Sequence, residues 1–176
     1  MNVSIAIWLV LGACAIAVLT DLRSRRIPNL LTAALALAAL VLHATQGFVP
    51  FAVACATLIG VLLIGFVAFS FGWLGGGDVK LLAAGAAALG LPDAVPFLIY
   101  TAIGGGLLAL VVAIAMGRLK SVLASVTLLL RPFAYKGTVA VAPAKSITLP
   151  YAVAIAFGAV AVALSHSAAP FLRLPL

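Results

Sequence analysis

Long apolar runs separated by short polar, glycine or proline breaks dominate the chain. Six such runs cover residues 3–20, 30–46, 49–73, 79–91, 95–117 and 147–165. The first run has no charged residue, and as a helix it would measure about 27 Å at ~1.5 Å per residue, close to the thickness of a hydrocarbon core. The pattern therefore predicts an all-α polytopic membrane protein with about six transmembrane helices.

The fourth run is short, and the breaks between runs are typical of helices. A helix of about 12 residues crosses only part of a hydrocarbon core of ~30 Å, so its ends need shelter from neighbouring helices. Breaks fall at Asn29, Gly47, Pro92 and Pro150. The continuous apolar composition between them favours helices over the alternating ten-residue strands of an outer-membrane barrel.

Composition agrees with a membrane location. Apolar residues make up 66% of the 176 residues and charged residues only 7%, which excludes an ordinary soluble domain. Since no polar linker or low-complexity tract interrupts the runs, we expect a single integral membrane domain over residues 1–176. Cys14 and Cys55 lie inside apolar runs without metal-ligand spacing, so we expect neither a disulfide nor a metal site, and no cofactor.

Basic residues predict the orientation. With six spans, the loops 21–29, 74–80 and 118–146 share one side of the membrane. They hold nine of the ten basic residues: Arg23, Arg25, Arg26, Lys80, Arg118, Lys120, Arg131, Lys136 and Lys145. The positive-inside rule places these loops in the cytoplasm and both termini outside. The net charge of +7 is thus mainly topological, with attraction to anionic lipid as a secondary effect and no reason to invoke nucleic acid. The run 121–131 is too short to span and is expected to lie in the interface or to be re-entrant.

The chain has only three acidic residues, and two of them are predicted at one depth. Asp21 closes the first span on the cytoplasmic side, Asp78 begins the fourth on the same side, and Asp93 lies in an outer loop. A structural interpretation is available for each: Asp21 as a helix-end residue paired with a nearby arginine, and Asp78 as a helix N-cap. An ionisable group at this boundary normally faces protein or water rather than lipid.

Three glycines precede Asp78, and a cap alone does not require them. Gly75, Gly76 and Gly77 lack Cβ atoms, so the backbone there can approach another segment closely, and an extended substrate peptide could pass. Two carboxylates at one depth can share a proton, with one as general base toward water and the other as general acid. This arrangement is the basis of aspartic-protease chemistry.

Three stretches resemble a known family. They are "DLRSRRIPN" (21–29), "GGGDVKLLAAGAAALG" (75–90) and "LPYAVAIAFGA" (149–159), and they are similar to type IV prepilin peptidases, specifically the short form associated with tight-adherence pili. The family belongs to the GxGD intramembrane aspartyl proteases, which include presenilin. By position, the resemblance implies that Asp21 and Asp78 are the catalytic aspartates. It also matches Gly75 and Gly77 to the glycines of GxGD and Lys80 to a basic residue of that block, and with Gly76 these form the expected substrate-binding residues.

The resemblance implies cleavage of the basic leader from prepilins or pseudopilins at the cytoplasmic face of a bacterial inner membrane, for pilus assembly or protein secretion. Longer members of the family carry a cysteine tetrad that holds zinc, and they also methylate the processed pilin. No such tetrad follows residues 21–29 here, so neither zinc nor methyltransferase activity is expected.

The sequence excludes one other protease chemistry and leaves two other functions open. HExxH zinc chemistry is excluded because the chain has no glutamate and its two histidines, His43 and His166, are in outward-side segments. A small proton-coupled transporter could use the two aspartates as a relay, although relay carboxylates usually lie deeper in a bundle. A non-catalytic assembly factor of a pilus or secretion machine is the third alternative.

Overall fold

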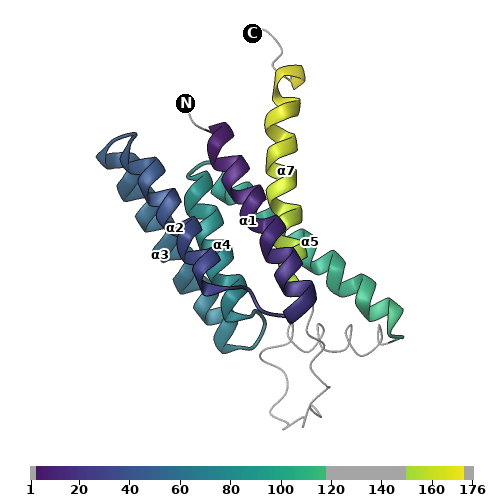
Figure 1. Ribbon diagram of the computed structural model, residues 1–176. Coiled ribbons are helices and arrows are strands. Elements are labelled where there is room, and N and C mark those ends of the chain that lie inside the picture. The colour runs from purple at the N-terminus through teal and green to yellow at the C-terminus, as the bar shows by residue number, and fades with distance from the viewer. Residues whose placement is uncertain (1–2, 118–149, 173–176) are drawn as a thin grey trace, which may run out of the picture. The chain divides into compact units, whose positions relative to one another are not determined.

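The computed structural model describes residues 3–117 and 150–172, and these residues form six α-helices (Figure 1). The helices are α1 (Val3–Ser24), α2 (Asn29–Ala44), α3 (Phe48–Ser70), α4 (Gly76–Leu89), α5 (Ala94–Ala115) and α7 (Tyr151–Leu172). The all-α prediction is confirmed, and α4 is the shortest described helix, with 14 residues. The run 121–131, expected in the interface, lies outside the described residues.

The chain divides into two compact units. The first comprises Met1–Gly105 with Pro150–Leu176, and the second comprises Gly106–Leu149, so α5 runs from one unit into the other. The residues of the candidate site described below lie in the first unit. The expectation of one domain over residues 1–176 stays a prediction.

Three described helices are long and apolar enough to cross a membrane. They are Ile5–Ser24, Phe48–Ser70 and Ala94–Ala115. Two shorter apolar helices, Asn29–Ala44 and Tyr151–Ser167, accompany them. Several apolar helices of these lengths are typical of a polytopic membrane protein.

Helix α1 continues past the predicted end of the first apolar run and carries Asp21 within its last turns. The Ser24 hydroxyl donates to the Thr20 carbonyl at 2.8 Å, and the Arg25 N–H donates to the Asp21 carbonyl at 2.8 Å. Arg25 has a φ of 51°, the left-handed conformation that commonly terminates a helix. Residues 26–28 then connect α1 to α2, which begins at Asn29.

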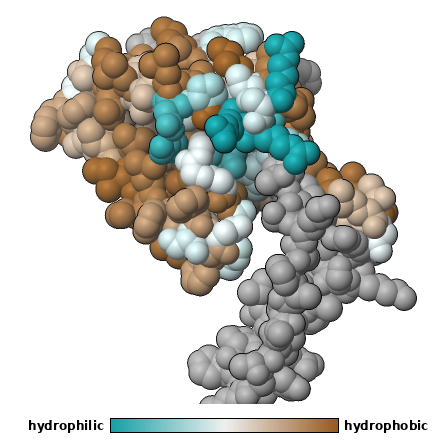
Figure 2. Space-filling model, turned by 60° about the horizontal axis from the view of Figure 1, so that its bottom comes forward, coloured by the Kyte–Doolittle hydropathy of each residue, from teal (hydrophilic) through white to brown (hydrophobic). Residues whose placement is uncertain are grey.

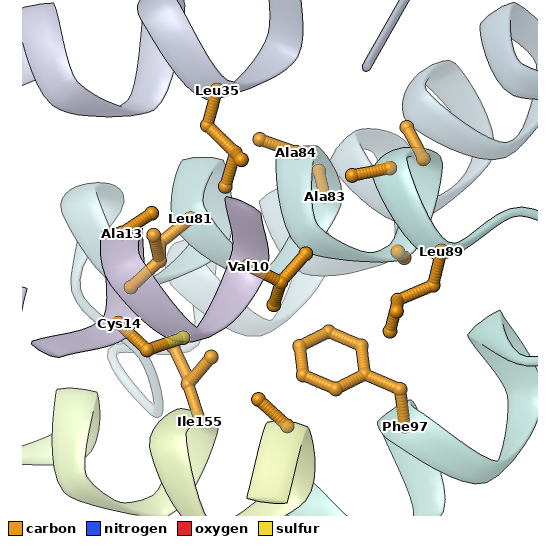
Figure 3. Packing of buried hydrophobic residues seen from close by; sticks show 14 of the residues in the cluster. Val10, Ala13, Cys14, Leu35, Leu81, Ala83, Ala84, Leu89, Phe97 and Ile155 are labelled. Carbon is orange, nitrogen blue, oxygen red and sulfur yellow. The ribbon is translucent and has the colours of Figure 1, made fainter. Parts of the chain in front are cut away.

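The buried core is built around α4. Val79, Leu81 and every residue from 83 to 89 are buried, most of them alanines or glycine, which allow neighbouring helices to approach closely. In Figure 3, Leu81 and Ala84 of α4 lie among Val10 and Ala13 of α1 and Leu35 of α2. This enclosure explains how a helix of 14 residues is accommodated: neighbouring helices cover it from Leu81 to Leu89, whereas its first turn lies at the polar end of the unit.

Both histidines contact the segment at the C-terminal end of α4. The His43 Nε2 of α2 lies 3.2 Å from the Ala88 carbonyl oxygen. The His166 Nε2 of α7 lies 2.9 Å from Asp93 Oδ2 in the α4–α5 turn. Asp93 therefore has a structural partner at the end of α4 opposite to Asp78.

Candidate active site

Asp21 and Asp78 lie at one end of the first unit, where α1 ends and α4 begins (Figure 1). Viewed from that end, hydrophilic side chains gather in a patch that hydrophobic surface borders (Figure 2). Exposed polar residues from the end of α1 to the start of α2, and on α4, are Arg23, Ser24, Arg25, Arg26, Asn29 and Lys80. Asp21 and Asp78 themselves are half-buried.

Asp21 presents a carboxylate oxygen that its surroundings do not satisfy. Its Oδ2 atom is buried and has no hydrogen-bond partner among the described residues. Buried polar atoms almost always have a partner in the protein or in ordered water. The Asp21 oxygen is therefore suited to accept a hydrogen bond from water or from a substrate group.

Asp78 is the third residue of α4, not its N-cap as the structural interpretation had it. Gly75 is the N-cap, and its N–H donates to Asp78 Oδ2 at 3.2 Å. The carboxylate thus satisfies one of the free N–H groups at the helix start and lies near the positive end of the helix dipole. Asp78 does contribute to capping, but from inside the first turn.

The two carboxylates are close enough to interact electrostatically. Asp78 lies outside the three helices that are long and apolar enough to cross a membrane. Burial raises the pKa of Asp78 to about 6, with a further upward contribution from the negative charge of Asp21, while the Gly75 N–H acts in the opposite direction. A carboxyl with this pKa can hold a proton near neutral pH beside an ionised partner.

At each of the three glycines before Asp78, an added Cβ would meet a side chain of this protein. A Cβ at Gly75 would lie 2.7 Å from Asp78 Oδ2, so glycine at this position makes room for the carboxylate. A Cβ at Gly76 would be in ordinary contact with the Phe69 ring at 3.6 Å. A Cβ at Gly77 would lie 3.1 Å from the Ile27 Cβ, closer than Cβ atoms normally approach. Glycine at positions 75 and 77 therefore allows close packing against Asp78 and Ile27, and a role of the glycines toward substrate stays a prediction.

Lys80 joins α4 to the start of α2. Its ammonium donates to Asn29 Oδ1 at 2.9 Å, and the side chain is exposed. With the Gly77–Ile27 contact, this bond is the second direct link between the stretches 21–29 and 75–90, which are distant in the sequence. The structure therefore brings these two stretches together at one end of the first unit.

The third stretch, 149–159, contributes Tyr151 at the start of α7. Tyr151 is half-buried and packs against the core that surrounds α4. Its ring occupies the space beside Gly105 of α5, where a Cβ would lie 2.8 Å from a ring carbon. The contacts of Ile27, Asn29 and Tyr151 had no signal in the sequence, because each depends on a residue far away in the chain.

No group of three or more histidine, cysteine or acidic side chains comes together as a potential metal site within residues 3–117 and 150–172. Cys14 is buried and Cys55 half-buried, and both are free thiols.

Comparison with known protein families identifies a match. The model of the type IV leader peptidase family matches residues 8–110, more than half of the 176 residues, and this range includes both aspartates. No curated protein and no solved structure matches the chain.

Proposed function

This chain belongs to the type IV leader peptidase family, and on that premise we propose that it is a membrane-embedded aspartyl endopeptidase with Asp21 and Asp78 as its catalytic pair. Its substrates would be type IV prepilins or pseudopilins, from which it removes the leader peptide for pilus assembly or protein secretion. The observation that carries the proposal is the placement of two half-buried carboxyl groups at the polar end of an otherwise apolar unit, where the charge of Asp21 contributes to the raised pKa of Asp78.

The chemistry follows from one proton shared by two carboxyl groups. Burial favours placing that proton on Asp78, which then acts as the general acid, while Asp21 acts as the general base. Asp21 takes a proton from a water molecule, and the oxygen of that water attacks the scissile carbonyl carbon. The C–N bond then breaks, and Asp78 supplies the proton that the leaving amine requires. The unpartnered Oδ2 of Asp21 supports the role of base, since it can accept the hydrogen bond of the attacking water.

The same proposal includes an orientation. The basic loops, which hold nine of the ten lysines and arginines, lie in the cytoplasm of a bacterium, and both termini lie outside the inner membrane. The two aspartates are on the side of these loops, so cleavage takes place at the cytoplasmic face. The Gly75 N–H donates to the Asp78 carboxyl group, and we place the extended leader segment of the substrate along the start of α4, at Gly75, Gly76, Gly77 and Lys80.

Co-expression with a prepilin tests the proposal. Asp21→Asn and Asp78→Asn should each leave the prepilin at full length on a gel, at normal membrane levels of the enzyme, because one carboxyl group cannot act as both base and acid. Asp93→Asn is the matched control, since Asp93 pairs with His166 at the opposite end of α4 and should allow normal cleavage. Substantial cleavage by Asp21→Asn or Asp78→Asn would refute the catalytic pair.

A further inference from the structure

Helix α3 presents an apolar groove to the surroundings of the first unit. Only 11% of its membrane-spanning stretch is buried, the lowest share among the three long apolar helices. Leu58, Leu62, Phe66 and Phe69 recur every three or four residues along α3 and line two adjoining cavities. We call this surface the α3 groove. It extends over about 16 Å of helix at ~1.5 Å per residue.

The two cavities of the α3 groove have different second walls. The first, of about 280 Å³, lies between α3 and the α2 residues Asn29, Thr32, Ala33 and Ala36. The second, of about 460 Å³, lies between α3 and the start of α4, where Gly76 and Val79 line it. Leu62 and Lys80 line both cavities, so the two adjoin at Lys80.

Among residues 3–117 and 150–172, Lys80 is the only charged residue that lines either cavity. One of the three donors of its ammonium is used by Asn29 Oδ1 at 2.9 Å, which leaves two for a ligand. Asn29 is the first residue of α2 and Lys80 is in the second turn of α4, so the cation lies at the same end of the first unit as Asp21 and Asp78. The first cavity is therefore polar at this end and apolar toward Ala36 and Leu58.

An occupant that matches this pattern has an anionic group joined to a long apolar chain. We propose that the α3 groove binds an anionic phospholipid, with its phosphate at Lys80 and an acyl chain along Leu58 and Leu62. Basic pockets between membrane helices on the cytoplasmic side are a known setting for anionic lipid headgroups. A groove between two neighbouring helices suits a single hydrocarbon chain better than a further helix, whose diameter is about 10–12 Å.

Native mass spectrometry of the purified full-length chain tests the proposal. Delipidated protein is titrated with phosphatidylglycerol and, separately, with phosphatidylcholine of the same acyl chains. Phosphatidylglycerol should be retained more strongly, and Lys80→Gln should weaken its retention about fivefold, as for the loss of one lysine near an anionic headgroup. Retention of phosphatidylcholine should fall less, because its choline cation offsets the charge of its phosphate. A soluble glycerophosphate should not displace the lipid, because it lacks the acyl chain that the groove binds.

Two matched controls separate the groove from general effects of charge and shape. Arg23→Gln removes one exposed positive charge at the same end of the unit, outside both cavities, and should not change retention. Ala33→Phe fills the first cavity and should weaken retention of both lipids. Ala34→Phe changes the neighbouring exposed alanine, which lines neither cavity, and should leave retention of both lipids unchanged.

Equal retention of the two lipids by the unmodified protein, or equal effects of Lys80→Gln and Arg23→Gln, would overturn the proposal. It would also be overturned if Ala33→Phe left lipid retention intact and impaired prepilin cleavage, because the groove would then bind substrate. Lipid retention is measured without any cleavage step, so its outcome is independent of whether the chain is a peptidase.

Discussion

Gly77 packs directly against Ile27, so that a Cβ at residue 77 would lie 3.1 Å from the Ile27 Cβ. This contact holds the first turn of α4, with Asp78, against the connection that follows α1 and Asp21. Gly77→Val adds a branched side chain there and should push the two segments apart, which should abolish prepilin processing without unfolding the protein. The measurement is cleavage at matched expression, with thermal stability in detergent alongside.

A second-site change distinguishes packing from a substrate role of Gly77. Gly77→Ala places a Cβ against Ile27 and should lower cleavage, and Ile27→Gly should restore part of that loss if the Ile27 Cβ is the obstacle. If Gly77 borders the substrate instead, the double variant should be no better than Gly77→Ala alone. Gly12→Ala is the matched control, because a Cβ at Gly12 meets nothing within 4 Å and should leave cleavage unchanged.

The raised pKa of Asp78 makes stability depend on pH. Its folded-state value of about 6 lies above the ordinary unfolded value of ~3.9, so the folded state binds more protons between these values. The contribution of Asp78 to the free energy of unfolding is therefore fully present below about pH 4 and is lost as the pH rises through about 6. The melting temperature of the unmodified protein minus that of Asp78→Asn should thus be larger near pH 5 than near pH 7.

The cause of the raised pKa is tested in the same experiment. Burial is the main contribution and should persist in Asp21→Asn, while the smaller contribution from the Asp21 charge is removed. The pH-dependent change of melting temperature should therefore move to lower pH in Asp21→Asn. An unchanged profile would mean that the two carboxyl groups do not interact, which would remove the observation that carries the proposed function.

Much of the fold could be predicted from the sequence, because apolar runs of this length form helices in a bilayer and the breaks between them mark the helix ends. Six runs corresponded to six described helices, and the short fourth run corresponded to the enclosed helix α4. The end of α1 was missed: polar residues after residue 20 continue the helix through local hydrogen bonds such as that from Ser24 to Thr20. Hydropathy does not detect such bonds, since it records only where apolar residues stop.

The candidate site was predictable in part, for a different reason. With alternating spans, the end of the first run and the start of the fourth must be on the same side, which brings Asp21 and Asp78 to one end. The partners of the glycines were not predictable, because the contact of Gly77 with Ile27 depends on how the α1–α2 connection folds. The Lys80–Asn29 bond depends likewise on the packing of α2 on α4.

The proposed orientation predicts the location of reporter fusions. Fusions after Arg26 and within 132–145 should report the cytoplasm, since these loops hold most of the positive charge. Fusions after Gly47 and after Leu176 should report the outside. A cytoplasmic location of the fusion after Leu176 would contradict an even number of spans and would place α7 differently in the membrane.

The contact of α7 with α5 predicts that replacing Gly158 destabilises the protein. A Cβ at Gly158 would collide with Thr101 Oγ1 and would lie 2.9 Å from the Phe97 carbonyl oxygen, which is backbone and cannot rotate away. Gly158→Ala should therefore lower the free energy of unfolding by about 1–3 kcal/mol, the usual cost of overpacking. Thr101→Ala should recover little of this loss because the Phe97 carbonyl remains. Gly60→Ala, with nothing within 4 Å, should instead be neutral or stabilising by up to ~1 kcal/mol, since alanine favours helix. Equal stabilities of Gly158→Ala and Gly60→Ala in detergent melting would show that α5 and α7 do not pack this closely.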